Sequence, residues 1–179
     1  MKKPPVSKNI YWDACVFLDL IEGDEERRHG IEAVLDEASK GRFLIHTSVL
    51  TIAEVMYAKS EKDNAVLNRD IECKIRALWQ PGSPFALVDV FRGIVEDAQE
   101  LSRESMANKV SVKPADAIHL ATARRLGCFA FHTFDDKFIK HSDKLCKILK
   151  MKMKISIPSV SGTFPFGKPS LKSHDDTSV

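Results

Sequence analysis

Four acidic residues that lie far apart in the chain could together perform metal chemistry. They are Asp13, Glu54, Asp116 and Asp135. Each is expected at a point where a strand ends or a helix begins. Carboxylate oxygens are the ligands that the hard divalent cations Mg²⁺ and Mn²⁺ prefer in proteins. Four carboxylates brought to one place would therefore form a site for one or two such ions.

Each acid taken alone also has a purely structural explanation. Asp13 and Asp135 could cap the helices that follow them, and Asp116 could complement the dipole of a helix from its first turn. Glu54 lies three residues after Thr51, and T-x-x-E is the pattern of a capping box. These single-residue interpretations stay open at this point.

The four acids considered jointly favour a shared site. In a parallel α/β sheet, the strand-to-helix junctions open on the carboxyl edge, where ligands bind. Helix capping does not explain why no Lys or Arg lies within two residues of Asp13 or Glu54, or why the apolar run 10–12 leads directly to Asp13. Clustered carboxylates repel one another by roughly a few kcal/mol when they are partly buried, and a divalent cation removes that cost.

The elements that must position these acids alternate between strands and helices. Short apolar runs predict strands at 10–12, 43–46, 85–90, 129–131 and 154–157. Apolar residues at helical spacing predict helices at 15–21, 31–41, 49–56, 71–78, 94–108, 114–127 and 138–149, with a charged break at 22–28. This alternation favours an α/β fold with a mainly parallel central sheet and helices on both of its faces.

Glycine, proline and hydroxyl residues mark the ends of several predicted elements. Gly41 suits the position just after a helix, and Pro114 suits an early helical position. Ser48 or Thr51 is expected near the N-cap of the helix at 49–56. The sequence Pro-Gly-Ser-Pro at 81–84 separates a helix from the third strand.

The length and composition indicate one folded domain with a tail. The chain has 179 residues, of which 44% are hydrophobic and 29% are charged, as in ordinary globular domains. Residues 1–158 are assigned to the domain. Residues 159–179 are rich in Ser, Gly, Pro and Lys, so we expect a flexible or loosely docked tail there.

Several features predict a cytoplasmic protein. No stretch approaches the roughly 18 apolar residues that a membrane span needs, and the basic start MKKPPVSKN lacks the apolar run of a signal peptide. The four cysteines form no C-x-x-C pair and lie in apolar segments, where buried free thiols are expected. Free thiols fit a reducing compartment.

Four segments in order along the chain carry a resemblance to a known family. They are Y-W-D-A-C-V-F-L around Asp13, T-S-V-L-T-I-A-E-V ending beside Glu54, K-P-A-D-A-I-H-L-A-T-A around Asp116, and H-T-F-D-D-K-F around Asp135. With these segments the chain resembles PIN-domain nucleases, and among them the VapC-like ribonuclease toxins of toxin–antitoxin modules. The resemblance covers about residues 10 to 157.

The resemblance implies a fold, a reaction and partners. The fold would be a three-layer α/β/α sandwich, and the activity would be Mg²⁺- or Mn²⁺-dependent endoribonucleolytic cleavage of RNA. The four acids take the family's metal-binding positions, and Thr133 takes the position of a hydroxyl that shapes the pocket. The T-x-D-x-x-F register with Phe138 selects Asp135 rather than Asp136. A small antitoxin protein and a homodimer are the implied protein partners.

A lysine-rich segment near the end of the domain is a candidate RNA-binding surface. The net charge of the chain is only +2, but residues 137–154 hold seven lysines and one acid. Within it, four lysines at 3-4-3 spacing share one helix face: Lys137, Lys140, Lys144 and Lys147. That face could bind phosphates, which predicts strong salt dependence, or it could be an ordinary solvated helix face.

Other interpretations stay open beside the nuclease. His119 follows Asp116 by three residues, so it lies on the same helix face and is either a packing histidine or a residue that reaches the site. A non-catalytic PIN-like module that binds RNA or protein is the alternative function. An aspartyl-phosphate enzyme of the haloacid-dehalogenase type is disfavoured, because Cys15 occupies the position two residues after Asp13 where that chemistry needs a second acid.

Overall fold

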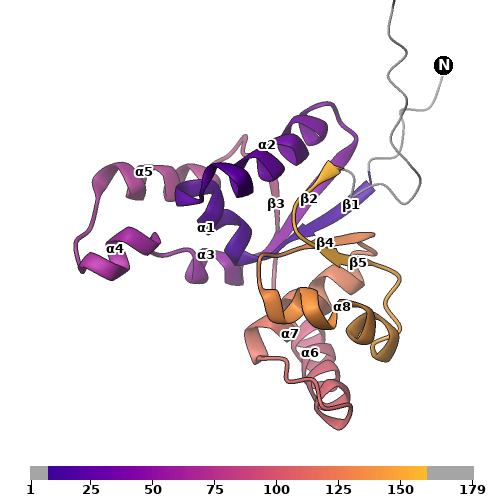
Figure 1. Cartoon of the computed structure of the whole chain (residues 1–179). Coiled ribbons are helices and arrows are strands. Elements are labelled where there is room, and N and C mark those ends of the chain that lie inside the picture. Colours follow the sequence, from indigo (N-terminus) through magenta and orange to yellow (C-terminus); the bar gives the residue numbers. More distant parts are fainter. Residues whose placement is uncertain (1–7, 161–179) are drawn as a thin grey trace, which may run out of the picture.

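A parallel sheet of five strands forms the middle of the molecule (Figure 1). The structure is a computed structural model and describes residues 8–160. The strands are β1 (Lys8–Trp12), β2 (Phe43–Ser48), β3 (Phe85–Val88), β4 (Ala130–His132) and β5 (Lys154–Ser156). They are arranged in the order β3-β2-β1-β4-β5, and every neighbouring pair is parallel. All five carboxyl ends therefore meet at one edge of the sheet.

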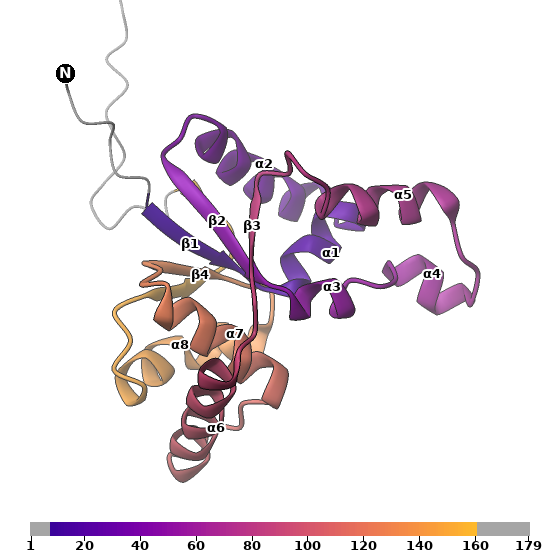
Figure 2. The ribbon, with the colours of Figure 1, turned by 180° about the vertical axis from the view of Figure 1, so that it is seen from behind.

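Helices cover both faces of this sheet (Figures 1 and 2). One face is covered by α1 (Ala14–Glu22), α2 (Glu25–Ser39) and α5 (Arg69–Leu78), and the other by α6 (Arg92–Ala107), α7 (Pro114–Arg125) and α8 (Asp136–Ile148). Figure 2 shows β3 leading into α6. The predicted three-layer α/β/α sandwich with a parallel sheet is confirmed.

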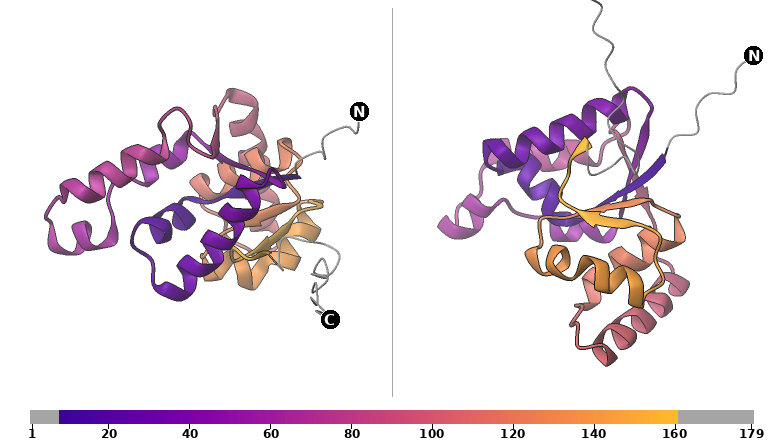
Figure 3. Two further views of the ribbon diagram at one scale, coloured as in Figure 1. Left: turned by 90° about the horizontal axis from the view of Figure 1, so that it is seen from above. Right: turned by 45° about the vertical axis from the view of Figure 1, so that its right-hand side comes forward.

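Two further short helices follow β2 on the side of α1. They are α3 (Leu50–Glu54) and α4 (Lys59–Asn64). Figure 1 shows α4 at the far end of a segment that projects from the rest of the molecule, and Figure 3 shows the same arrangement from above. The predicted helix at 49–56 is present as the shorter α3, whereas the helix at 59–64 was not predicted.

Alternation along β1 divides the core into two layers. Tyr11 belongs to the apolar cluster under α6, α7 and α8, whereas Ile10 and Trp12 belong to the cluster under α1, α2 and α5. All three side chains are fully buried, as the period of two along a central strand requires. Replacing a buried Trp by Ala typically costs about 3–5 kcal/mol, so β1 is held rigidly at the position from which it leads to Asp13.

The predicted charged break at 22–28 is wrong. Helix α2 begins at Glu25, and its N-cap Asp24 accepts a hydrogen bond from the Arg27 N–H. A capping acid followed by two glutamates in the first turn, Glu25 and Glu26, is a favourable helix start, because these charges complement the helix dipole. Only residues 23–24 separate α1 from α2.

Several predicted element ends are confirmed. Gly41 and Gly127 adopt positive φ values of 72° and 63° just after α2 and α7, a conformation that costs glycine little. Pro114 is the first residue of α7.

No helix in the described range 8–160 is long and apolar enough to cross a membrane. Residues 161–179, most of the predicted tail, lie outside the described part of the chain.

The cysteine prediction holds only in part. Cys128 is buried, Cys15 and Cys146 are partly buried, and Cys73 is exposed on α5. Cys73 lies in a helix of which only Ile71 is buried, so an apolar neighbourhood in sequence did not ensure burial there.

Candidate active site

Asp13 lies at the carboxyl end of the central strand and is held from two sides. One carboxylate oxygen, Oδ1, accepts a hydrogen bond from the Ala14 N–H at 2.7 Å, which caps α1. The other, Oδ2, accepts from the Thr133 hydroxyl at 2.9 Å. Asp13 is only 7% exposed. Asp13 therefore both caps α1 and belongs to the candidate site. Its two hydrogen bonds fix the orientation of its carboxylate.

Thr133 connects Asp13 to Asp135. Its backbone N–H continues the sheet by donating to the Ser156 carbonyl, which places the residue directly after β4. Its hydroxyl donates to Asp13 and accepts from the Asp135 N–H at 3.0 Å. The predicted pocket-shaping hydroxyl thus lies between two of the four acids.

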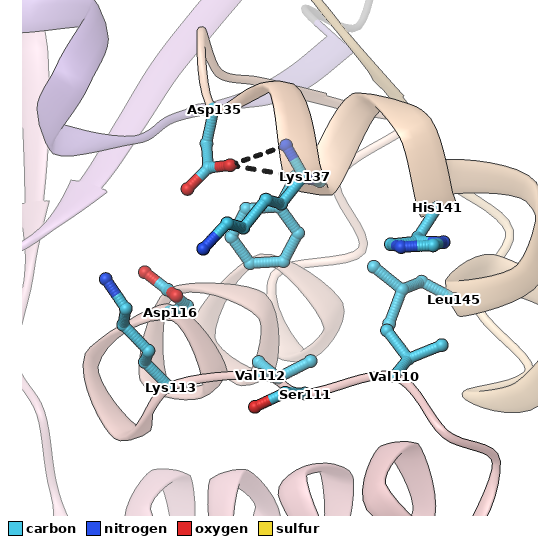
Figure 4. Close-up of a pocket in the computed structure, with 10 residues that line it drawn as sticks. Val110, Ser111, Val112, Lys113, Asp116, Asp135, Lys137, His141 and Leu145 are labelled. Atoms are coloured by element: carbon cyan, nitrogen blue, oxygen red, sulfur yellow. Dashed lines mark hydrogen bonds between the residues drawn. The ribbon is translucent and has the colours of Figure 1, made fainter.

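Asp135 caps the helix that begins beside it. Its Oδ1 accepts hydrogen bonds from the backbone N–H groups of Lys137 and Phe138 at the start of α8, drawn as dashed lines in Figure 4. The neighbouring Asp136 is exposed in the first turn of α8 and does not line the pocket described below. This arrangement agrees with the choice of Asp135 over Asp136.

Asp116 lies in the first turn of α7, on the side that faces Asp13 and Asp135. Its pKa is raised above the usual aspartate range, first by partial burial and then by the negative charges of Asp13 and Asp135. Each of the three aspartates comes from a different junction of the fold. The raised pKa reports repulsion among them, which a bound cation would relieve.

Glu54 lies at the end of a helix, and not at a strand end or a helix start as predicted. It is the last residue of α3, whose N-cap is Val49 without a side-chain hydrogen bond. Thr51 lies inside the helix, where its hydroxyl pairs with that of Thr47 at 2.6 Å. The capping-box interpretation of Glu54 is therefore wrong. Its Oε2 instead lies 2.6 Å from Nε2 of His119 on α7.

His119 belongs to a buried chain of hydrogen bonds that ends at Glu54. The Ser48 N–H donates to the Tyr11 hydroxyl at 2.9 Å, and that hydroxyl lies 2.7 Å from Nδ1 of His119. In the neutral imidazole, Tyr11 donates to Nδ1 and Nε2–H donates to Glu54; in the charged form both ring nitrogens donate. Nε2 therefore donates to Glu54 in either form.

The environment of His119 favours its charged form. Burial lowers its pKa, but the hydrogen bond to Glu54 and the charges of Asp13, Glu54 and Asp116 outweigh burial and raise it. Nε2 also lies 3.8 Å from Asp13 Oδ1. The side chain is fully buried and lies beside two of the acids, so it is at once a packing histidine and part of the site. Tyr11 was not predicted to take part.

The donor set fits Mg²⁺ or Mn²⁺ by its chemistry. The four acids offer only oxygen, which both ions prefer. The charge repulsion on Asp116 also indicates a place where a cation is favoured. Among residues 8–160, however, no group of three or more His, Cys, Asp or Glu side chains is arranged so that it could hold an ion as it stands. The acids therefore lie in one region without forming a closed coordination shell.

A pocket of about 100 Å³ opens beside Asp116 and Asp135. Figure 4 shows the two carboxylates facing each other across its mouth, with the ammonium groups of Lys113 and Lys137 near them. Of the four predicted RNA-binding lysines, Lys137 lines this pocket, and the other three are exposed on α8 outside its lining: Lys140, Lys144 and Lys147. Lys113 was not predicted, although the K-P-A-D segment places it at the N-cap of α7.

Comparison with known proteins agrees with this fold. The sequence model of the PIN domain matches residues 10–144. A search of curated protein sequences finds no match. Solved structures that resemble the chain include the Mycobacterium tuberculosis toxin VapC20, described as cleaving the sarcin–ricin loop, with 16% identity, a TM-score of 0.53 and coverage of 73% of this chain and 93% of that one.

Two further structures are similar to the chain. VapBC2 from Rickettsia felis, bound to promoter DNA, has 15% identity, a TM-score of 0.56 and coverage of 74% of this chain and 92% of that one. FitAcB from Neisseria gonorrhoeae has 15% identity, a TM-score of 0.57 and coverage of 83% and 97%. At these identities the structures show a shared fold, whereas the sequence model spans most of the described domain. The chain belongs to the PIN domain family.

Proposed function

We propose that this protein is a metal-dependent endoribonuclease that hydrolyses RNA phosphodiester bonds at the site formed by Asp13, Glu54, Asp116 and Asp135. The observation that carries the proposal is the convergence of three aspartates from separate strand–helix junctions: the Thr133 hydroxyl bonds both the Asp13 carboxylate and the Asp135 N–H, and Asp116 and Asp135 line one pocket. The similarity to VapC20, a toxin that cleaves the sarcin–ricin loop, supports RNA as the substrate.

The chain's own residues would orient the reacting groups. The Thr133 hydroxyl fixes the carboxylate of Asp13 and the backbone of Asp135, and His119 holds Glu54 in place. The four acids would hold Mg²⁺ or Mn²⁺, which when bound would supply an activated water and neutralise charge on the phosphoryl oxygens. Lys113 and Lys137 add positive charge at the mouth of the pocket, where an RNA phosphate would otherwise meet only acids.

The test is cleavage of RNA by the full chain with Mg²⁺ or Mn²⁺ and with a chelator. We expect cleavage only with the metal ion, and a loss of about a hundredfold or more in Asp13→Asn, since a fixed electrostatic group of this kind typically contributes that much. Asp136→Asn is the matched control, because Asp136 is exposed outside the pocket. Full activity of Asp13→Asn, or equal cleavage in the chelator, would contradict the proposal.

The second candidate is a PIN-like module that binds RNA or protein without cleaving. The observation on its side is that the acids of the described chain do not form a ready coordination group. This function would be favoured if the unmodified protein binds RNA tightly at millimolar Mn²⁺ but does not cleave it.

A small antitoxin protein and a second copy of the chain are the proposed protein partners. The antitoxin is supported by the VapBC2 and FitAcB complexes among the similar structures. The projecting segment, residues 55–68 around α4, also carries exposed apolar side chains of the kind that mark contact surfaces: Met56, Tyr57, Val66 and Leu67. Co-purification with the product of a neighbouring small gene tests the first partner, and the mass in solution tests the second.

A further inference from the structure

We propose that the pocket beside Asp116 and Asp135 binds one unstacked pyrimidine base of the RNA, next to the phosphate that is cleaved. The pocket would thereby set a sequence preference for cleavage. The inference rests on the proposed nuclease function and adds to it a subsite whose ligand is a single-ring base.

Two preformed walls face each other in this pocket (Figure 4). One wall is the extended segment 110–112 between α6 and α7, anchored by a hydrogen bond from the Val110 N–H to the Ser105 carbonyl at 2.9 Å. The other wall is one face of α8, where Phe138, His141 and Leu145 follow a spacing of three and four residues. Because Val110, Phe138 and Leu145 are buried in the core, the walls need no rearrangement to receive a ligand.

The size of the pocket limits it to one ring. Its volume of about 100 Å³ is smaller than the cavity of about 150 Å³ that is known to enclose benzene. A single six-membered ring would therefore enter with its outer edge at the open mouth, whereas most of a fused purine would stay outside. The Ser111 hydroxyl and the His141 imidazole line the pocket beside the apolar surface and offer hydrogen-bonding atoms to the polar edge of a base.

The position of the pocket argues for a nucleotide rather than a protein side chain. Asp116 and Asp135 belong both to the proposed metal site and to the lining of the pocket. A phosphate bound at these acids has its own base only one ribose away. Proteins commonly recognise single-stranded RNA through unstacked bases held against aromatic side chains, and the small exposed part of Phe138 brings an aromatic edge to the lining of this pocket. An apolar side chain of a partner protein would instead bury two carboxylates without compensation, which is unfavourable.

The charged mouth of the pocket also suits an RNA strand. Lys113 and Lys137 are both exposed and lie at the same end as the two acids. With a divalent ion at the acids, this end would attract phosphates, while the far end combines the apolar Val110 and Leu145 with the imidazole of His141. The pocket therefore has one end for the backbone and one for a base.

The test compares two substrates in the full chain with Mn²⁺. One is an RNA library with random positions, whose cleavage products are sequenced, and the other is bis(p-nitrophenyl) phosphate, a diester without a base. Val112→Trp fills the pocket, and Val95→Trp is the matched control, because Val95 is 47% exposed outside the pocket. Thermal unfolding shows whether each variant is folded; His141→Ala, which widens the pocket, serves as a second variant.

The expected results distinguish recognition of the base from hydrolysis of the phosphodiester bond. The unmodified protein and Val95→Trp prefer a pyrimidine beside the cleaved bond. Val112→Trp loses about tenfold or more in RNA cleavage, the effect of losing one stacked base, and its preference disappears, whereas its diester hydrolysis changes by less than about twofold. His141→Ala weakens the preference and cleaves the diester normally.

The opposite results overturn the inference in distinguishable ways. An unchanged preference in folded Val112→Trp and in His141→Ala, or equal losses on both substrates, overturns the base pocket and leaves the nuclease intact. The absence of any base preference in the unmodified protein does the same. If the unmodified protein hydrolyses neither substrate with Mn²⁺, the proposed function itself is overturned, and the subsite with it.

Discussion

His119 holds Glu54 at the carboxyl edge of the sheet, with 2.6 Å between Nε2 and Oε2. The contact joins α7 to the end of α3, two elements whose contacting residues are 65 positions apart in the chain. Because Tyr11 occupies the other ring nitrogen, the imidazole cannot turn away without breaking two buried hydrogen bonds. Glu54 is thereby held by its neighbours in space and not by its own helix.

Removing the Tyr11 hydroxyl should destabilise the fold. Tyr11→Phe keeps the ring stacked on Phe131 but removes the buried partner of the Ser48 N–H and leaves His119 Nδ1 with only the Ser48 hydroxyl at 3.4 Å. We expect a loss of about 1–3 kcal/mol in the free energy of unfolding, measured by urea denaturation. The control is Tyr57→Phe, since Tyr57 is half exposed; equal stabilities of the two variants would contradict the hydrogen-bond chain.

Removing the His119 imidazole should weaken metal binding at the proposed site. His119→Ala frees Glu54 to rotate. The loss of a residue that orients a metal ligand typically lowers metal affinity or activity by about 10- to 100-fold, and we expect a loss of about that size here. The comparison is RNA cleavage as a function of Mn²⁺ concentration, with His29→Ala on the exposed face of α2 as control. If the Mn²⁺ concentration at half-maximal cleavage is unchanged in His119→Ala, Glu54 does not need the hydrogen bond from His119.

The lysine at the pocket should matter more to RNA binding than those farther along α8. Lys137→Ala is expected to weaken binding and to reduce the slope of log affinity against log salt by about one, as the loss of one phosphate contact does. Lys147→Ala, exposed on the same helix but outside the pocket, should have a smaller effect. Equal effects would favour a diffuse basic surface over a defined contact.

An ion pair between α6 and α7 should make stability sensitive to acid. The hydrogen bond from Arg125 lowers the pKa of Asp97, and the charges of Arg125 and Arg124 add to the effect. A lowered carboxyl pKa stabilises the fold above the unfolded pKa of about 3.9 and loses this contribution as the pH falls through the folded pKa.

Asp97→Asn should therefore lower stability at neutral pH by less than about 1 kcal/mol, the usual range for exposed ion pairs. The difference from the unmodified protein should vanish at low pH. Unfolding curves at pH 7 and pH 3 measure both effects. A difference that is constant across this range would mean that the charge of Asp97 does not contribute.

The sheet and three of the acids could be predicted from local patterns. Apolar runs locate the strands, and an acid directly after a central strand, as at Asp13, or at a helix start, as at Asp116 and Asp135, is fixed in place by the local backbone. Parallel connections then bring these junctions to one edge. These relationships need no knowledge of which side chains meet across the fold.

The surroundings of Glu54 could not be predicted in this way. Thr51 and Glu54 have capping-box spacing, but the Val49 N–H is engaged by the Val88 carbonyl of β3. The sheet thus extends one residue further than the pattern assumes, and α3 begins after Val49, which leaves Thr51 inside the helix. The partner of Glu54 is His119 on α7, which is itself bonded by Tyr11 on β1, and no local sequence signal specifies such contacts. The i+3 spacing of Asp116 and His119 was the only hint.

The central claim is that four acids form one divalent-metal site, and calorimetric titration with Mn²⁺ tests it most directly. The unmodified chain is predicted to bind Mn²⁺, and the single changes Asp13→Asn, Glu54→Gln, Asp116→Asn and Asp135→Asn are each predicted to weaken binding about tenfold or more. Asp136→Asn should bind as the unmodified chain does. Binding that is absent in the unmodified chain, or unaffected by all four changes, would contradict the claim.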